Sequence, residues 1–459
     1  MRSAGLGWLG PLGLALLTLG RAVAAIEIDT SSQDSIKHAS WVFAHGLMSY
    51  YNGNQTGQTV GMFVDGYYWW ESGAAWGSML DYWYYTGDET YNDIITAALL
   101  HQAGSDKNYM PSNQTTTEGN DDQAFWGFTV MAAAERNFTN PPDDDAQWLE
   151  LSQGVFNSMA ARWDTQYCGG GLRWQIFQFN NGYDYKNTVS NAGLFMMAAR
   201  LARYTSNDTY YDWAVRVWDW VADVGFMNPD YYYFYDGAYI STNCTTINNL
   251  QWTYNAGLFL ASSAYLYNYT ATLGNTTDAT MWANRTQNIL DNIGIFFKSG
   301  IMYEVACETG DKCNTDERSF KAYLARFMGL TAQLAPFTYD TIYNYLLTTS
   351  PGIASSCTGG SDNVTCGATW ITGEWDSTWG LGQQMCALEA TQNLLVGSVA
   401  APYTSTTGGS SKGDASAGTS GDDDEEDSNK TTVGDRVGAG FLTSIVLFIL
   451  LGAAWWIVV

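Results

Sequence analysis

A helix pair that recurs along the chain is the feature that most restricts how this sequence can fold. In each pair, a helix rich in small and apolar residues precedes a short polar turn and a more amphipathic helix. The first helices are expected to begin near residues 72, 121, 189, 252, 318 and 378, at intervals of 49, 68, 63, 66 and 60 residues. Such repetition predicts one repeat architecture across some 370 residues rather than several unrelated domains.

The two kinds of helix differ in where their apolar residues lie. The first helices, expected at 72–86, 121–137, 189–204, 252–269, 318–334 and 378–395, are apolar nearly all round, which is typical of an interior position. Their partners are expected at 91–101, 146–163, 210–224, 280–297 and 339–347. The segment 38–51 can complete the sixth pair, so we predict an all-α (α/α)6 barrel of six inner and six outer helices. An open solenoid is the alternative. Strand-like segments at 172–179 and 231–239 are expected to form hairpins in loops.

The loops before the inner helices should meet at one mouth of such a barrel, because all inner helices run the same way. They carry Trp, Tyr, amide and carboxylate side chains, among them Trp69, Trp70, Glu71, residues 118–122, Tyr185, Trp252, Asp316, Trp370 and Asp376. Aromatic faces stack on sugar rings and polar groups bind hydroxyls, so the mouth suits a carbohydrate. Core packing is the alternative for any single aromatic residue.

Two adjacent carboxylates, Asp121 and Asp122, lie at the expected start of one inner helix. Asn120 fits the N-cap, with Gln123 as capping-box partner. Acidic residues also stabilise helix N-termini by about 0.3–1 kcal/mol each, which is the purely structural interpretation. The chemical interpretation is that glycosidic bond cleavage needs two carboxyl groups. The helix N-terminus would favour an ionised nucleophile, and repulsion would raise the pKa of the other carboxyl group so that it serves as the acid.

Four motifs together resemble glycoside hydrolase family 76, and in particular its fungal, GPI-anchored cell-wall branch. They are GNDDQAFW at 119–126, CGGGLRWQI at 168–176, YKNTVSN at 185–191 and CNTDERSFKAYL at 313–324. The resemblance covers about residues 26–400. It implies an (α/α)6 fold and a retaining enzyme for α-1,6-mannan, with Asp121 as nucleophile and Asp122 as acid/base. It also implies a transglycosidase that joins the mannose-containing GPI glycan of proteins to wall β-glucan. Glu317 departs from the family pattern, which has Gln there.

Loop position and motif similarity together give a set of substrate-binding candidates. These are Trp70, Asn120, Trp126, Arg173, Trp174, Gln175, Lys186, Asn187, Asn191, Asp236, Trp252, Tyr254, Asp316, Arg318 and Trp375.

Both ends of the chain indicate export. Residues 1–25 have the layout of a secretory signal peptide, with an uncleaved anchor as the alternative. The catalytic domain is expected at 26–400, followed by a Ser/Thr/Gly-rich and acidic linker at 401–436 and an apolar tail at 437–459. Small residues, a polar spacer and a terminal apolar tail predict a GPI signal, with attachment at Ser428 or Asn429. A transmembrane helix is the alternative for the tail.

Glycosylation sequons and cysteines agree with an oxidising, extracellular setting. Ten sequons occur, at Asn54, Asn113, Asn137, Asn207, Asn243, Asn268, Asn275, Asn284, Asn363 and Asn429. Local disulfides are expected between Cys307 and Cys313 and between Cys357 and Cys366. The other three cysteines, Cys168, Cys244 and Cys386, leave at least one thiol free or a different pairing.

Charge and cysteine spacing also limit the ligands. The net charge of −26 argues against nucleic acid, although six of the negative charges lie at 422–427. Cysteine and histidine spacing suggests no metal site, and no cofactor is expected. The hypotheses are an enzyme, expected as a monomer, with a mannan or GPI-glycan donor, a β-glucan acceptor and a membrane anchor, or a non-catalytic anchored carbohydrate-binding wall protein. A lyase is disfavoured, because 20 Lys and Arg residues supply few cationic groups.

Overall fold

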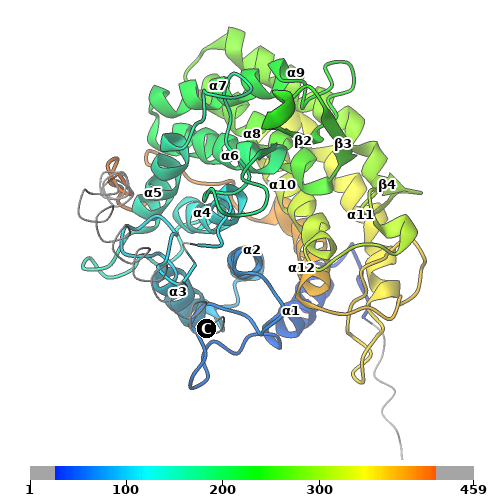
Figure 1. Ribbon diagram of the computed structural model, residues 1–459. Helices are drawn as coiled ribbons and strands as arrows, with labels where there is room; N and C mark the ends of the chain where they lie inside the picture. The colour runs from blue at the N-terminus through cyan, green and yellow to red at the C-terminus, as the bar shows by residue number, and fades with distance from the viewer. Residues whose placement is uncertain (1–25, 115, 420–459) are drawn as a thin grey trace, which may run out of the picture.

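The chain forms two concentric rings of helices (Figure 1). The structure is a computed structural model that describes residues 26–114 and 116–419. The inner helices are α2 (Trp69–Thr86), α4 (Asn120–Glu135), α6 (Thr188–Thr205), α8 (Thr253–Thr272), α10 (Phe320–Leu334) and α12 (Leu381–Gln392). The outer helices are α1 (Gln33–Met48), α3 (Asn92–His101), α5 (Trp148–Ala161), α7 (Asp208–Asp223), α9 (Thr276–Asn292) and α11 (Tyr339–Ser356). The predicted (α/α)6 barrel is thereby confirmed.

The barrel is closed by contacts between the two ends of the domain. Each inner helix packs against the next, and α12 packs against α2 to complete the inner ring. The first outer helix, α1, packs against α12 and so completes the sixth pair, as its sequence predicted. These contacts exclude the open solenoid.

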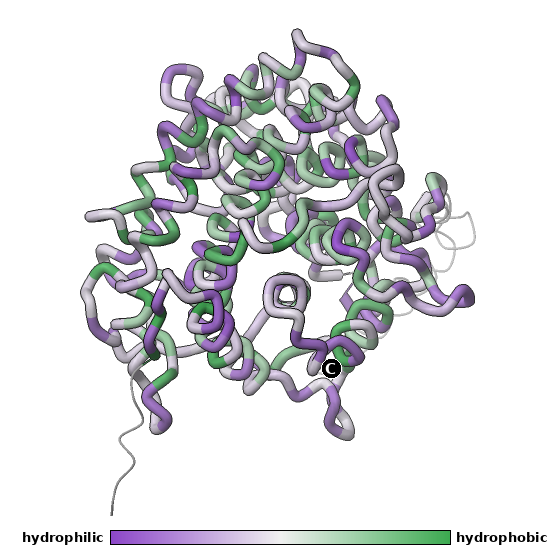
Figure 2. Tube along the Cα trace, turned by 180° about the vertical axis from the view of Figure 1, so that it is seen from behind, coloured by the Kyte–Doolittle hydropathy of each residue, from purple (hydrophilic) through white to green (hydrophobic). Residues whose placement is uncertain are grey.

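Burial follows the ring that each helix occupies. The inner helices are buried on nearly every side, whereas outer helices such as α7 and α9 bury one face only. Small residues let the inner helices approach closely: a Cβ atom on Gly73 would lie 2.7 Å from the ring of Trp126. Seen from behind in Figure 2, hydrophilic residues gather in the outer turns and loops.

Short strands line the loops on the side of the barrel where the inner helices begin. Strands β1 (Tyr185–Asn187), β2 (Tyr235–Tyr239) and β3 (Ile247–Gln251) form an antiparallel sheet in that order, and β4 (Phe297–Lys298) pairs with β5 (Ile301–Met302). The strand expected at 172–179 is wrong, since that segment forms only an isolated bridge between Gly119 and Gln175. The side chain of Asn191 bonds both backbone groups of Leu172, and the backbone groups of Trp174 bond Asn120 and Tyr185, so the segment finds its partners without a regular strand.

Helix boundaries depart from the expectations in two informative places. Helix α11 continues to Ser356 through Pro351, beyond the end expected at 347. Helix α4 is capped by Gly119 rather than Asn120, because the side-chain oxygen of Asn120 accepts from Arg162 at 2.8 Å. The capping-box partner is Asp122 rather than Gln123, whose side-chain amide donates to the carbonyl of Asn108. Six short 3-10 helices complete the described elements: η1 (Ile240–Thr242), η2 (Ile293–Phe296), η3 (Glu308–Gly310), η4 (Glu317–Ser319), η5 (Pro336–Thr338) and η6 (Asn393–Ser398).

Residues 401–419, here called the C-terminal strap, pack against the barrel and are coloured orange in Figure 1. The Tyr403 amide donates to the carbonyl of Glu135 at 2.7 Å, and the Ser405 amide donates to that of Tyr204 at 3.0 Å. Farther along, the Ser411 hydroxyl accepts from the Leu149 amide at 2.9 Å. The folded body therefore extends to residue 419, past the boundary expected at 400.

The expected signal peptide at 1–25, the attachment residues Ser428 or Asn429 and the tail at 437–459 lie outside the described residues. Within the described ranges, no helix has the length and apolar character needed to cross a bilayer. Disulfides join Cys168 to Cys244, Cys307 to Cys313 and Cys357 to Cys366, while Cys386 is a buried free thiol.

Sequon asparagines differ in accessibility. Those that are exposed are Asn54, Asn113, Asn207, Asn243, Asn275, Asn284 and Asn363. Asn137 and Asn268 are half-buried, and their amides donate to the backbone carbonyls of Gly408 and Leu334. Glycan attachment at these two residues would have to accommodate those hydrogen bonds.

Candidate active site

A cavity of about 170 Å³ lies where the inner helices begin. Its walls come from the starts of α2, α4, α8 and α10 and from β1 and β2. The lining residues are Trp70, Asp121, Asp122, Phe125, Trp174, Tyr185, Asn187, Asp236, Tyr254, Asp316 and Phe320. The barrel thus gathers residues from about 70 to 320 in the sequence into one small carbohydrate-sized space.

Asp121 and Asp122 lie in the first turn of α4 and have different partners. Asp122 Oδ2 accepts from the Gly119 amide at 2.7 Å, which caps the helix. Asp121 Oδ1 accepts from the Asp122 amide at 3.2 Å, and its Oδ2 accepts from the Asn187 side chain at 3.5 Å. Both side chains remain partly accessible from the cavity. Two neighbouring carboxyl groups therefore reach the same space with different surroundings.

The surroundings raise the pKa of both carboxyl groups. Burial is the largest cause for each. For Asp122 the neighbouring charge of Asp121 adds to the rise, whereas hydrogen bonds from the Asp122 amide and from Asn187 hold the pKa of Asp121 down. Asp122 consequently keeps its proton to higher pH than Asp121. This order suits an ionised Asp121 beside a protonated Asp122.

Aromatic and amide groups form the walls around the pair. Tyr254 stacks on Phe320 with ring centroids 4.1 Å apart, and Trp70 packs against Phe125 at 4.7 Å. Trp174 is 38% exposed at the rim. Its ring lies over Gly182, where a Cβ atom would come within 2.4 Å of it, and φ is +98°. Only glycine fits that position comfortably.

Asp236 is held by three donors. Its Oδ2 accepts from the Tyr185 hydroxyl at 2.6 Å and from Asn248 at 3.1 Å, and its Oδ1 accepts from Trp252 Nε1 at 2.9 Å. This carboxylate is therefore fixed in orientation on the wall of the cavity. Trp252 acts on the site through Asp236 and does not line the cavity itself.

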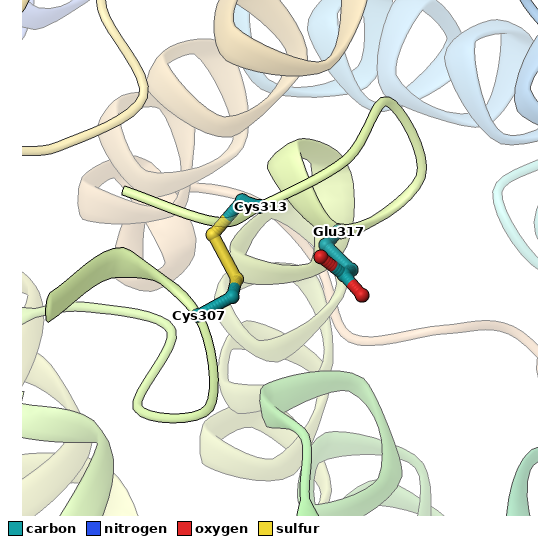
Figure 3. A group of neighbouring side chains, drawn as sticks. All are labelled: Cys307, Cys313 and Glu317. Carbon is teal, nitrogen blue, oxygen red and sulfur yellow. A yellow bond between two sulfur atoms is a disulfide. The ribbon is translucent and has the colours of Figure 1, made fainter. Parts of the chain in front are cut away.

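Asp316 enters the cavity three residues after Cys313, which a disulfide joins to Cys307. Its Oδ1 accepts from Trp70 Nε1 at 3.2 Å, and burial raises its pKa to about 6. Glu317 lies outside the cavity lining, and its carboxylate accepts from the Asn314 amide at 2.8 Å. Figure 3 shows Glu317 beside the Cys307–Cys313 disulfide. These three residues form a group with metal-like spacing, but both sulfur atoms are committed to the disulfide.

Three predicted binding residues are buried behind the cavity. Trp126 lies between Trp69 and Tyr109 in the core. Lys186 donates to the carbonyls of Asp164, Tyr167 and Gly170. It points away from the cavity because alternate residues of a strand face opposite sides, and its neighbours Tyr185 and Asn187 face inward. The side chain of Asn191 is hydrogen-bonded to the backbone of Leu172.

Other candidates lie around the cavity. Asn120 accepts from Arg162, and Arg173 pairs with Asp164 at 2.9 Å and lines a separate groove. Gln175 lines a cleft next to the cavity. Arg318 donates to the carbonyl of Cys313, and Trp375 donates to that of Thr378. The candidates that do reach the cavity are Trp70, Trp174, Asn187, Asp236, Tyr254 and Asp316.

The binding set missed Phe125, Tyr185 and Phe320 as lining residues. Phe125 lies four residues after Asp121 on α4, so helical spacing places both on one face. Tyr185 was expected at the mouth of the barrel. That its side chain faces the cavity follows only from the position of strand β1. Phe320 begins α10 and resembles an ordinary core residue in the sequence.

Comparisons with known proteins agree with this geometry. The sequence profile of glycosyl hydrolase family 76 matches residues 35–406. Mannan endo-1,6-alpha-mannosidase DCW1 of Saccharomyces cerevisiae is 52% identical over 98% of both chains, and DFG5 of the same yeast is 48% identical over 96% of both.

Solved structures are similar as well. Dfg5 from Chaetomium thermophilum, in complex with glucosamine, is 40% identical with a TM-score of 0.81, covering 86% of this chain and 97% of that one. An α-1,6-mannanase of Salegentibacter is 16% identical with a TM-score of 0.62, covering 78% of this chain and 98% of that one. The second likeness shows the fold alone.

Proposed function

This chain belongs to glycoside hydrolase family 76, and on that premise we propose that it is a retaining enzyme that cleaves α-1,6-linked mannosyl bonds. The donor is mannan or the mannose-containing glycan of GPI-anchored proteins. The acceptor is wall β-glucan, so the enzyme cross-links such proteins to the wall. The observation that carries the proposal is the pair of carboxyl groups in one cavity, held in unequal surroundings.

The proposed reaction has two displacement steps. The Asp121 carboxylate attacks the anomeric carbon while the Asp122 carboxyl group gives its proton to the departing glycosidic oxygen. A covalent mannosyl–Asp121 intermediate remains. Asp122, now ionised, takes a proton from water or from a sugar hydroxyl, whose oxygen attacks the same carbon and releases Asp121. Water gives hydrolysis, and a sugar hydroxyl gives transfer.

The substrate assignment rests on similarity, and the surroundings of the cavity are compatible with it. The yeast relatives carry the name mannan endo-1,6-alpha-mannosidase. Stacked aromatic walls and a fixed carboxylate, Asp236, suit the faces and hydroxyls of a neutral sugar. We further propose that the protein acts outside the cell as a monomer, held at the plasma membrane by a GPI anchor.

Chemical rescue tests the two roles. The protein is produced from residue 26 to residue 419, here called the secreted body. An α-mannosyl fluoride donor is incubated with the secreted body and with its Asp121→Ala and Asp122→Ala variants, with and without azide. Loss of the acid/base should lower kcat on α-1,6-mannan by about 10²–10⁴-fold. Azide should rescue Asp122→Ala with an α-mannosyl azide, because it attacks the covalent intermediate. It should rescue Asp121→Ala with a β-mannosyl azide, because it attacks the donor directly from the opposite face.

The alternative outcomes separate the hypotheses. If Asp121→Ala gave the α-mannosyl azide and Asp122→Ala the β-mannosyl azide, Asp122 would be the nucleophile and Asp121 the acid/base. A parent that binds mannosides but converts none of the donors would favour the non-catalytic wall-binding hypothesis. A parent that yields only free reducing sugars in the presence of abundant β-glucan would retain the glycosidase and remove the transfer step.

A further inference from the structure

A single helical turn at residues 304–308, here called the Glu304 turn, contacts the starts of two inner helices, α8 and α10. The Glu308 amide donates to the carbonyl of Glu304 at 3.0 Å and closes the turn. Side chains four residues apart on a helix are neighbours on one face, so both carboxyl groups can reach the same part of the barrel. Both side chains are buried, and neither is among the residues that line the catalytic cavity. The turn can therefore act on the cavity only from behind its wall.

Glu304 caps α8 from outside that helix. Its Oε2 atom accepts from the Thr253 amide at 3.1 Å and from the Thr253 hydroxyl. The first amides of a helix have no partner within it, and Trp252, which precedes α8, makes no side-chain capping bond. An acceptor from a distant part of the chain therefore satisfies a donor that α8 cannot satisfy itself.

The residues on either side of Thr253 line the catalytic cavity or orient a residue that does. Tyr254 lines the cavity, and its ring stacks on that of Phe320 with centroids 4.1 Å apart. Trp252 donates to Asp236, which also lines the cavity. A shift of Thr253 would consequently move the aromatic wall and one donor of Asp236 together.

Glu308 holds the start of α10 through a buried lysine. Its Oε1 atom accepts from Lys321 Nζ, and both side chains are nearly inaccessible. Lys321 also donates to the carbonyl of Ala368, and its Nζ lies 4.1 Å from the ring centroid of Trp370. The residue before Lys321 is Phe320, the second ring of the aromatic stack. The two carboxyl groups of the Glu304 turn thus hold the neighbours of both stacked rings.

We propose that Glu304 and Glu308 are positioning residues for the catalytic cavity. They tie the starts of α8 and α10 to one turn, and in this way they hold the ring of Tyr254 against that of Phe320. Groups that orient a substrate must be placed accurately, because a small displacement lowers the rate even when the reacting groups are intact. The expected effect on rate rests on the proposed function, whereas the expected effect on the geometry of the wall does not.

Two replacements of Glu304 separate positioning from loss of charge. Burial raises its pKa to about 8, so below that pH the group is a neutral carboxyl that still accepts a hydrogen bond. Glutamine has the same length and also accepts, so Glu304→Gln should keep kcat on α-mannosyl fluoride within about twofold of the parent. Glu304→Ala leaves the Thr253 amide without that acceptor, and kcat per folded molecule should fall about tenfold.

The contact of the turn with α10 is tested without leaving a buried charge. Glu308→Ala alone would leave the Lys321 ammonium group unpaired in the interior, so it is combined with Lys321→Met. The double variant should also lower kcat per folded molecule about tenfold, because the start of α10 is released. An unchanged kcat in the double variant would remove Glu308 from the assignment.

Tyr265→Phe is the matched control on the same helix. The Tyr265 hydroxyl donates to Glu135 at 2.9 Å, so this change also removes a buried hydrogen bond of α8. Tyr265 lies about 18 Å farther along the helix axis than Thr253, at 1.5 Å per residue. The unfolding temperature of the control should fall, while its kcat per folded molecule should equal that of the parent.

Crystal structures of the secreted body and of Glu304→Ala test the geometry without any substrate. The ring centroids of Tyr254 and Phe320 should lie farther apart in the variant than the 4.1 Å described above. An unchanged stack overturns the assignment. An unchanged kcat per folded molecule beside a lower unfolding temperature also overturns it, because the turn would then support the fold alone.

Two further outcomes are distinguished in advance. If Glu304→Ala does not fold, Thr253→Val, which keeps the volume and loses the hydroxyl, replaces it in both measurements and should lower kcat about threefold. A parent that is inactive on every mannosyl donor rejects the proposed function. The crystal structures then decide alone whether the Glu304 turn positions the aromatic wall.

Discussion

At the scale of single residues, four aspartates share the small cavity, and the hydrogen bonds around each determine what it can do. Asp236 accepts three hydrogen bonds, which fix its orientation and leave Oδ1 with a single donor. Asp316 receives one from Trp70, and its negative charge raises the pKa of both Asp121 and Asp122. The adjacent pair could be predicted from the sequence because its spacing and helix position are local properties. The roles of Lys186 and Trp126 could not, because burial depends on which way each side chain points.

The charge of Asp316 gives a prediction about pH. A nearby negative charge favours the protonated form of a carboxyl group, so Asp316→Asn should lower the pKa of both catalytic carboxyl groups. The rising limb of kcat/KM, where Asp121 ionises, and the falling limb, where Asp122 ionises, should both move to lower pH. Glu317→Gln is the control, since Glu317 does not line the cavity. Limbs that stay in place, or that move to higher pH, would contradict the electrostatic role of Asp316.

At the scale of elements, the inner helices begin within three residues of the positions expected from the sequence, because burial on every side leaves a strong pattern. Helix ends could not be predicted from local residues where contacts with distant parts of the chain stabilise a longer helix. Pro351 and Gly352 indicate a helix end, yet α11 continues through them, and Gly352 packs so closely on Ile301 that a Cβ atom would approach to 2.8 Å. Disulfides cross-link the loops. One joins Cys307 to Cys313, 6 residues apart, and another joins Cys168 to Cys244, 76 residues apart.

The two disulfides should differ in how much they stabilise the protein. In the chain-entropy description, stabilisation grows with the length of the closed loop. Replacing Cys168 and Cys244 by serine should therefore cost about 2 kcal/mol more unfolding free energy than replacing Cys307 and Cys313. Urea unfolding of the two double variants measures this difference. The Cys307/Cys313 variant should nevertheless show the larger rise in KM, because Cys313 lies three residues before Asp316, which lines the cavity. Equal losses of unfolding free energy would indicate that the length of the closed loop does not determine how much each disulfide stabilises the protein.

At the scale of the whole molecule, charged groups are buried in the barrel away from the catalytic cavity. Asp81 pairs with Arg136, and Arg326 bonds Glu389 at 2.7 Å, with all four side chains nearly inaccessible. The C-terminal strap bonds the nearby ends of α4 and α6 through Glu135 and Tyr204. The strap was expected to be a linker because its Ser, Thr and Gly content is typical of one. Its backbone hydrogen bonds to the barrel are long-range and leave no local sequence pattern.

The strap gives a prediction about stability without activity. A secreted body ending at residue 400 should unfold at a lower temperature than one ending at residue 419, because it loses the hydrogen bonds of Tyr403, Ser405 and Ser411. The kcat per folded molecule should be the same, since no strap residue lines the catalytic cavity. Thermal unfolding and mannosidase assays of the two proteins measure both. Equal unfolding temperatures would show that the strap contributes nothing to the fold.

Closure of the ring by α1 and α12 also has a consequence during synthesis. The inner wall between α10 and α2 is missing until residue 392 has been made. At about 5–20 residues per second, translation reaches that point only after roughly 20–80 s. From the synthesis of α2 until that point, the growing chain presents apolar helix faces that only its last helix will cover. We therefore expect the growing chain to need protection by chaperones until α12 is made, and a chain that stops before α12 to be retained by quality control rather than released.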